Sequence, residues 1–93
     1  MYYTYVLRSD SNNRWYTRAT SDLKARFSDH AQGRVRATCG RRPLRLAYDE
    51  ACGNAADAFR RECYLKSGRG KRYLHQRLSE WLQPVSLKKL ERH

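Results

Sequence analysis

The segment RWYTRATSDLKARFSDH, residues 14–30, decides the fold of this chain. Its first part, residues 15–20, is rich in aromatic and β-branched residues, which favour a strand. Ser21 is the expected N-cap of a helix, and apolar residues then recur at helical spacing until Gly33 stops the pattern. The segment therefore predicts a strand that leads directly into a helix over residues 21–32.

The same signals predict the other elements. Turn residues DSNN separate an aromatic first strand from the strand described above, and Asn54 with Asp57 resembles a capping box at the start of a later helix. The expected elements are strands at residues 2–8, 15–20 and 44–51, helices at residues 21–32, 54–67 and 68–83, and a basic loop at residues 33–42. The order β-β-α-β-α-α predicts an α+β fold, in which helices flank a small three-stranded, mainly antiparallel sheet.

The length and charge of the chain limit its function. Ninety-three residues suffice for one small domain, which we expect over residues 1–83, followed by a C-terminal tail at 84–93. Twenty Lys and Arg residues against nine Asp and Glu residues give a formal net charge of +11. Such a charge attracts polyanions, so nucleic acid is the expected partner. A basic protein that binds RNA non-specifically remains an alternative.

Other features of the sequence argue against several classes of protein. The three cysteines form no CxxC pair, so neither a zinc site nor a disulfide framework is indicated. No apolar run approaches the ~20 residues of a membrane span, and the first residues lack the features of a signal peptide. We therefore expect a cytoplasmic protein without a membrane association.

Polar and aromatic residues that carry chemistry gather on the first two strands and the first helix. Strand alternation places Tyr3 and Tyr5 on one side of the first strand, and Tyr16 and Arg18 on one side of the second. Arg26 and His30, one helical turn apart, border the apolar stripe of the helix and can reach the same space. Tyrosines that merely favour strands, and a structural histidine beside Phe27, are the simpler alternatives.

The helix expected at residues 54–67 carries a carboxylate in an apolar stripe. Glu62 lies near the centre of the stripe, with Lys66 one turn later. The stripe comprises Ala55, Ala58, Phe59, Cys63 and Leu65, and the opposite side carries Asp57, Arg60 and Arg61. A carboxylate facing a core must be paired or bound to a cation. Glu62 is therefore either the partner of Lys66 in an ion pair, or a metal-binding or acid-base carboxylate.

Three stretches together resemble the successive motifs of the GIY-YIG nuclease superfamily: YTYVL, WYTRATSDLKARFSDH and RRECYLKSGRG. The similarity is to the short stand-alone form of this domain and covers residues 2–82. Lys66, Ser67 and Gly68 match the KSG ending of the family's glutamate helix. The resemblance implies a GIY-YIG fold with the catalytic residues Tyr5 and Tyr16 of the two half-motifs, Arg26, His30 and the metal-binding glutamate Glu62.

By this resemblance the protein would be an endonuclease that hydrolyses phosphodiester bonds in DNA, in repair or recombination, with DNA preferred to RNA. Glu62 would hold one Mg²⁺ or Mn²⁺, Tyr16 with Tyr5 or His30 would orient or deprotonate the attacking water, and Arg26 would offset charge on the phosphate. The expected substrate-binding cations are Arg18, Arg34, Arg36, Arg41, Arg42, Lys66 and Arg69. So small a domain would need a homodimer or a partner protein for specificity, or would cut with little sequence preference.

One residue departs from the family pattern. Arg18 stands where the second half-motif has glycine, which normally permits close approach of a substrate. Its side chain would either hold a phosphate or obstruct the cleft. The alternative function is therefore a nucleic-acid-binding module that keeps the GIY-YIG fold but is catalytically impaired.

Overall fold

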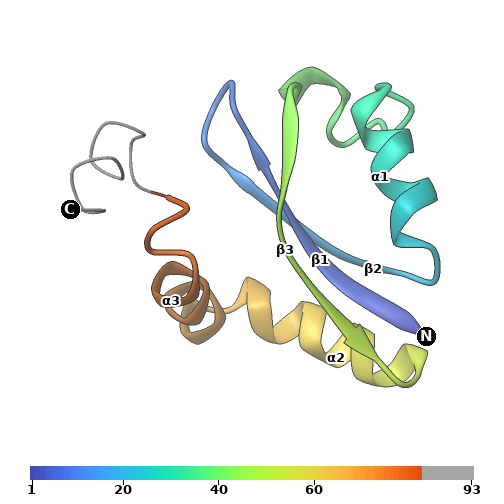
Figure 1. The fold of residues 1–93 in the computed structure, drawn as a ribbon, viewed down its shortest axis with the longest axis vertical. Coiled ribbons are helices and arrows are strands. Elements are labelled where there is room, and N and C mark those ends of the chain that lie inside the picture. Colours follow the sequence, from blue (N-terminus) through green and yellow to red (C-terminus); the bar gives the residue numbers. More distant parts are fainter. Residues whose placement is uncertain (83–93) are drawn as a thin grey trace.

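The structure, a computed structural model of the chain, describes residues 1–82. Its strands form one antiparallel sheet in the order β2-β1-β3, and the predicted α+β fold with the order β-β-α-β-α-α is confirmed (Figure 1). Among residues 1–82, no helix combines the length and the apolar character that a membrane crossing requires. The elements are β1 (Tyr2–Ser9), β2 (Trp15–Thr20), α1 (Leu23–Ala31), the short 3-10 helix η1 (Cys39–Arg41), β3 (Leu44–Cys52), α2 (Ala55–Lys66) and α3 (Gly68–Arg77).

The hairpin of β1 and β2 determines which side chains share a face of the sheet. Tyr5 lies opposite Arg18, and Leu7 lies opposite Tyr16. Directly opposed residues of an antiparallel pair project to the same side. The tyrosine-bearing sides of the two strands therefore face the same way, which the sequence alone did not decide, and Arg18 shares that face. In the turn, Asn13 adopts a φ of 61°, which asparagine tolerates well.

Each face of the sheet carries its own small core. The first is built on Tyr5, Leu7 and Leu44, against which residues of α1, β2 and β3 pack: Leu23, Phe27, Tyr16 and Leu46. The second is built on Val6, Leu65 and Leu74, against which residues of β2, β3, α3 and its C-cap pack: Trp15, Tyr48, Tyr73 and Leu78. Consequently α1 covers one face, whereas α2 and α3 cover the other (Figure 1).

Of the two N-caps predicted from the sequence, one is confirmed and the other is wrong. Asn54 caps α2 as expected, because its side chain accepts a hydrogen bond of 2.9 Å from the backbone N–H of Asp57. The prediction of Ser21 for α1 was wrong: Asp22 is the N-cap and accepts from the N–H of Ala25 at 3.0 Å. The Thr20 hydroxyl accepts from the Asp22 N–H, which holds the backbone before α1 in a tight turn.

The prediction for the C-terminal part of the chain also needs correction. Helix α3 begins at Gly68, where the sequence placed the start of this helix, and Ser67 both terminates α2 and caps α3. Helix α3 ends at Arg77 instead of continuing to residue 83. A turn instead lets the Trp81 ring approach the guanidinium group of Arg45, 4.9 Å from the ring centroid. The expected tail, residues 84–93, lies outside the described residues.

The buried face of α2 is narrower than the predicted apolar stripe. Ala58, Glu62 and Leu65 are buried, whereas Phe59 is 62% exposed. The hydroxyl of Thr4 donates to the Ala58 carbonyl at 2.7 Å, which fixes Ala58 against β1. At about 100° per residue, Phe59 then turns away from the sheet. Glu62 nonetheless faces the sheet, as predicted.

We predict that Gly70→Ala destabilises the protein by about 3 kcal/mol. A Cβ atom at Gly70 would lie 2.5 Å from the Cα of Leu65 and closer still to the Tyr64 carbonyl oxygen, and backbone atoms cannot yield as a side chain can. This cost exceeds the gain of about 1 kcal/mol in helix propensity. Urea unfolding measures the difference. Gly68→Ala is the matched control, since its nearest contact is the Arg72 guanidinium at 3.8 Å. Equal midpoints for the two variants would contradict the prediction.

Candidate active site

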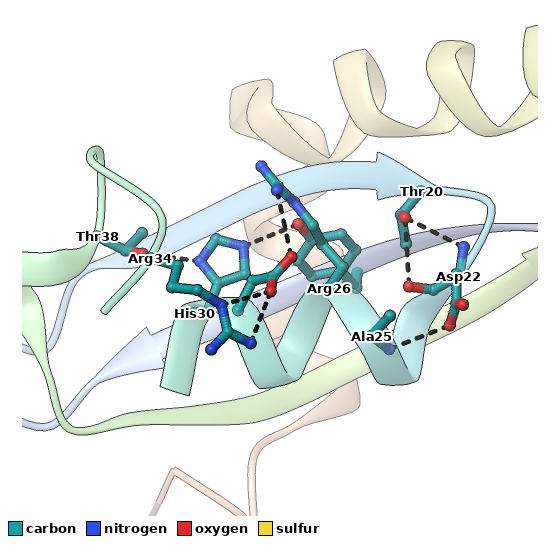
Figure 2. Close-up of polar contacts among 9 residues, drawn as sticks. Thr20, Asp22, Ala25, Arg26, His30, Arg34 and Thr38 are labelled. Carbon is teal, nitrogen blue, oxygen red and sulfur yellow. Dashed lines mark hydrogen bonds and ion pairs between the residues drawn. The ribbon is translucent and has the colours of Figure 1, made fainter. Parts of the chain in front are cut away.

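A buried histidine joins three parts of the fold. The His30 ring of α1 is fully buried, and its Nε2 lies 3.0 Å from the Tyr5 hydroxyl of β1 (Figure 2). Its Nδ1 lies 2.7 Å from the Thr38 hydroxyl, which belongs to the loop after α1. A neutral imidazole has one N–H donor and one acceptor nitrogen, and a hydroxyl can serve either. Both ring nitrogens are therefore satisfied without a charge.

The two motif tyrosines both contact this histidine. The Tyr5 and His30 ring centroids are 5.8 Å apart, and those of Tyr16 and His30 are 5.2 Å apart. Both pairs have edge-to-face geometry, a favourable arrangement for aromatic rings. The structure thus brings Tyr5, Tyr16 and His30 into one cluster on the α1 side of the sheet.

Burial and neighbouring charges act on the hydroxyl of Tyr5. Burial is the main reason that its pKa is raised above tyrosine's ordinary value of 10.0, while the guanidinium groups of Arg26 and Arg18 oppose the shift. Both arginines therefore lie near enough to act on this hydroxyl electrostatically. Because the pKa is raised overall, Tyr5 carries its proton at neutral pH and acts there through hydrogen bonding.

The pKa of His30 is shifted downward, opposite to the shift of Tyr5. Burial, followed by the positive charge of Arg26, lowers the pKa of His30 below its ordinary value of 6.5, and Asp29 acts weakly against this shift. The imidazole is consequently neutral at pH 7. A neutral His30 can accept the Tyr5 proton in a hydrogen bond while donating to Thr38, or take the reverse arrangement.

Arg26 is only loosely paired with a carboxylate, so its positive charge can act on other groups. It projects from α1 on the same side as His30 (Figure 2), and its side chain is 41% exposed. Its carboxylate neighbour Asp29 lies 3.9 Å away and is engaged more closely by Arg34, at 2.9 Å. A guanidinium that is only loosely paired beside the tyrosine cluster can interact with an incoming anion.

Glu62 lies on the other face of the sheet from the tyrosine cluster. It lies on the buried side of α2, and its Oε2 accepts a hydrogen bond from the Lys66 ammonium at 2.8 Å. Lys66 also lines a cavity of about 230 Å³ beside Tyr16, Arg18 and Lys71. This cavity lies along β2, an edge strand, where helices from both faces of the sheet can meet. The tyrosine cluster and the Glu62–Lys66 pair therefore approach one another at the β2 edge.

The ligand set around Glu62 suits a particular kind of metal ion. Among residues 1–82, no group of three or more His, Cys, Asp or Glu side chains is arranged to enclose a metal. Glu62 has an oxygen, Oε1, for which the described residues supply no hydrogen bond. Mg²⁺ is commonly held by one or two carboxylates, with water and substrate phosphates completing its coordination. A single carboxylate fits such an ion and not a dedicated metal cage.

The predicted substrate-binding cations are distributed unevenly. Arg18 and Lys66 line the cavity described above, and Arg69 is exposed in the first turn of α3. Arg34 is paired with Asp29, Arg36 is exposed, and Arg42 donates to the Cys39 carbonyl at 3.0 Å. The Ser9 hydroxyl binds the Arg41 carbonyl at 2.6 Å, which holds Arg41 at the end of β1, about 13 Å along the strand from Tyr5. Arg41 therefore lies away from the tyrosine cluster, whereas Arg34 lies near His30 through its pairing with Asp29 (Figure 2).

Thr38 is a site residue that the sequence did not indicate. Its hydroxyl lies 2.7 Å from His30 although eight positions separate the two residues. The surrounding sequence, RATCG, has neither periodicity nor a recognisable motif. The contact depends on how the loop folds back over α1, so no local signal predicts it.

Comparison with known proteins shows which family this chain resembles. The sequence model of the GIY-YIG catalytic domain matches residues 1–74. This chain belongs to the GIY-YIG family. UPF0213 protein SH2523 of Staphylococcus haemolyticus (strain JCSC1435) is 33% identical over 67 residues, which are 71% of this chain and 80% of that protein. The solution NMR structure of the UPF0213 protein BH0048 from Bacillus halodurans matches with a TM-score of 0.50 and 35% identity, over 82% of this chain and 84% of that one. The GIY-YIG resemblance inferred from the sequence is confirmed.

We predict that this GIY-YIG domain loses stability as the pH falls below about 6.5. Because the pKa of His30 is lowered in the folded state, the unfolded chain binds a proton there that the folded chain does not. The free energy of unfolding should decrease by at most about 1.4 kcal/mol per pH unit in this range. Urea unfolding between about pH 7.5 and 5.5, above the titration of most carboxylates, measures the slope.

Two variants isolate the contribution of His30. His30→Gln should be less stable at every pH but should lack the slope, because glutamine does not titrate. His75→Gln, which changes an exposed histidine, should retain the slope. A slope that persists in His30→Gln would contradict the assignment.

Proposed function

We propose that this GIY-YIG domain is a metal-dependent endonuclease that hydrolyses phosphodiester bonds in DNA. The observation that supports the proposal most directly is the Tyr5–His30–Tyr16 cluster with the charges of Arg26 and Arg18 beside it. Two tyrosine hydroxyls, a neutral imidazole and two guanidinium groups are suited to handling a water molecule next to a phosphate. Membership of the GIY-YIG family agrees with this chemistry.

The proton-handling groups have distinct roles in this mechanism. In this mechanism Tyr5 keeps its proton, and His30 would take the tautomer whose Nε2 accepts it in a hydrogen bond. The lone pairs of the Tyr5 oxygen would then be available to orient a neighbouring hydroxyl or water. Tyr16, whose ring packs on His30, is the residue that orients or deprotonates the attacking water. His30 fixes the positions of both tyrosines.

The cationic groups act on the phosphate. Arg26, loosely paired at 3.9 Å from Asp29, would offset the negative charge that accumulates on the pentacovalent phosphate. Arg18 would hold a non-bridging oxygen from the cavity side. Glu62 would hold one Mg²⁺ or Mn²⁺, which stabilises the leaving oxygen when bound.

We predict that Glu62→Gln abolishes nicking of a supercoiled plasmid in the presence of Mn²⁺ or Mg²⁺. The amide is nearly isosteric but lacks the charge that attracts the ion, so a loss of about 10³-fold or more is expected. Fluorescence anisotropy with labelled DNA in EDTA should give nearly unchanged affinity. Lys66 is 47% exposed, so water can solvate its ammonium once the carboxylate is gone, and the variant should stay folded.

Asp57→Asn is the matched control for this experiment. It removes the same charge at an exposed position in the first turn of α2, the helix that also carries Glu62. This control should nick DNA like the wild type. A Glu62→Gln variant that still nicks, or one that is inactive only because its urea midpoint collapses, would contradict a metal-binding role for Glu62.

We predict that Arg18→Gly lowers cleavage by about 10–100-fold, since it removes a charge-assisted contact with the phosphate. Arg18→Lys should recover part of the activity by restoring the charge. The measurement is the nicking rate at saturating metal. A glycine variant that gains activity over a silent parent would instead identify Arg18 as an obstruction, and the parent as a nucleic-acid-binding module.

A further inference from the structure

A second and larger cavity lies beside the start of β2. Its volume is about 450 Å³, and it lies between the β1–β2 turn and α3, with Leu82 at its rim. Trp15 stacks at a tilt on His75 of α3, with ring centroids 4.9 Å apart, and thereby forms one wall. The other lining residues are Arg8, Asn13, Arg14 and Lys71.

The lining of this cavity is strongly cationic. Arg8, Arg14 and Lys71 are permanent cations at neutral pH, and no carboxylate among residues 1–82 lines the cavity with them. The nearest acidic residue in the sequence, Asp10, is paired with Arg45 at 2.9 Å. Unbalanced positive charge of this kind favours an anion.

The guanidinium of Arg8 has unused hydrogen-bonding capacity. One terminal nitrogen donates to the Asn13 side chain at 3.2 Å, and the group lies 5.8 Å from the Trp81 ring centroid. Its Nε is buried and has no hydrogen-bond partner among the described residues. A buried donor without a partner is costly, and a bound anion that reorients the guanidinium would relieve that cost.

This cavity continues into the candidate active site. Trp15 and Lys71 line both the larger cavity and the smaller one that contains Tyr16, Arg18 and Lys66. Trp15 and Arg18 are three positions apart on β2, which corresponds to about 10 Å along the strand. Successive phosphates of one DNA strand advance about 3.4 Å along the helix axis, so this span matches about three nucleotides.

We propose that the cavity lined by Arg8, Arg14 and Lys71 binds a backbone phosphate of the DNA strand, about three nucleotides from the phosphate held at Arg18. This inference rests on the proposed function, because it takes DNA as the substrate. The volume and the apolar wall of Trp15 suit a nucleotide unit better than a lone inorganic ion. The cavity would orient the strand on the nuclease and fix its direction across the site.

Binding of single-stranded oligonucleotides to the full chain in EDTA tests the proposal without any cleavage. With wild-type protein, affinity should rise stepwise when the strand becomes long enough to span both contacts. Lys71→Ala should abolish that step and weaken binding of longer strands several-fold. It should also reduce the slope of log affinity against log salt by about 0.7, the value for one phosphate contact on a single strand.

Matched variants make the outcome decisive. Lys24→Ala removes the same charge from the exposed surface of α1 and should keep both the step and the slope. Arg14→Ala should reproduce the effect of Lys71→Ala, and Lys71→Arg should restore wild-type binding. If Lys71→Ala and Arg14→Ala behave like Lys24→Ala, the second phosphate site is disproved. Failure of the nuclease proposal would be seen separately, as an absence of nicking by wild-type protein that still shows the step.

Discussion

The hydrogen bonds of His30 hold together the parts of this domain on which its candidate active site depends. A fully buried imidazole is costly unless both nitrogens are satisfied, and here Tyr5 of β1 and Thr38 of the following loop satisfy them. The same contacts attach α1 to the sheet and fix Tyr5 and Tyr16 relative to each other. Because burial keeps His30 neutral, the cluster is stable without a counter-ion and leaves the charges of the neighbouring arginines available to a substrate.

The position of β2 at the edge of the sheet allows residues from both faces to act together. Tyr5 comes from the central strand and Arg26 from α1 on one face, whereas Glu62 comes from α2 on the other. If β2 were a central strand, a strand on each side of it would keep the residues of the two faces apart. An unprotected edge strand invites pairing with another chain, and charged side chains discourage it. Arg18, exposed on β2, therefore serves the fold as well as the proposed chemistry.

Local sequence signals predicted the parts of the structure that depend on short-range physics. The sharing of a side by Tyr16 and Arg18 followed from strand alternation, the Asn54 cap from the spacing to Asp57, and the element order from periodicity, whereas the hairpin register did not follow from the sequence. The missed features depend on tertiary contacts. The hydrogen bond between Thr4 and Ala58 sets the rotation of α2, so that Glu62 faces the sheet and Phe59 does not. Helix α3 ends at Arg77, and the turn that follows it brings Trp81 to Arg45. Thr38 reaches His30 only after the loop has folded.

The Glu62–Lys66 pair is the first of two alternatives that the sequence left open, an ion pair and a metal site, and its geometry is compatible with the proposed second one. Before a metal binds, a carboxylate that faces the core needs a cation, and Lys66 supplies one at 2.8 Å. The two partners differ in solvent exposure: the side chain of Glu62 is 8% exposed, and that of Lys66 is 47% exposed. Lys66 can therefore move into water at a modest cost, whereas Glu62 cannot leave. Under the proposed function, Glu62 would hold a divalent ion, and Lys66 would stay beside Arg18 in the same cavity, where a phosphate would be its next partner.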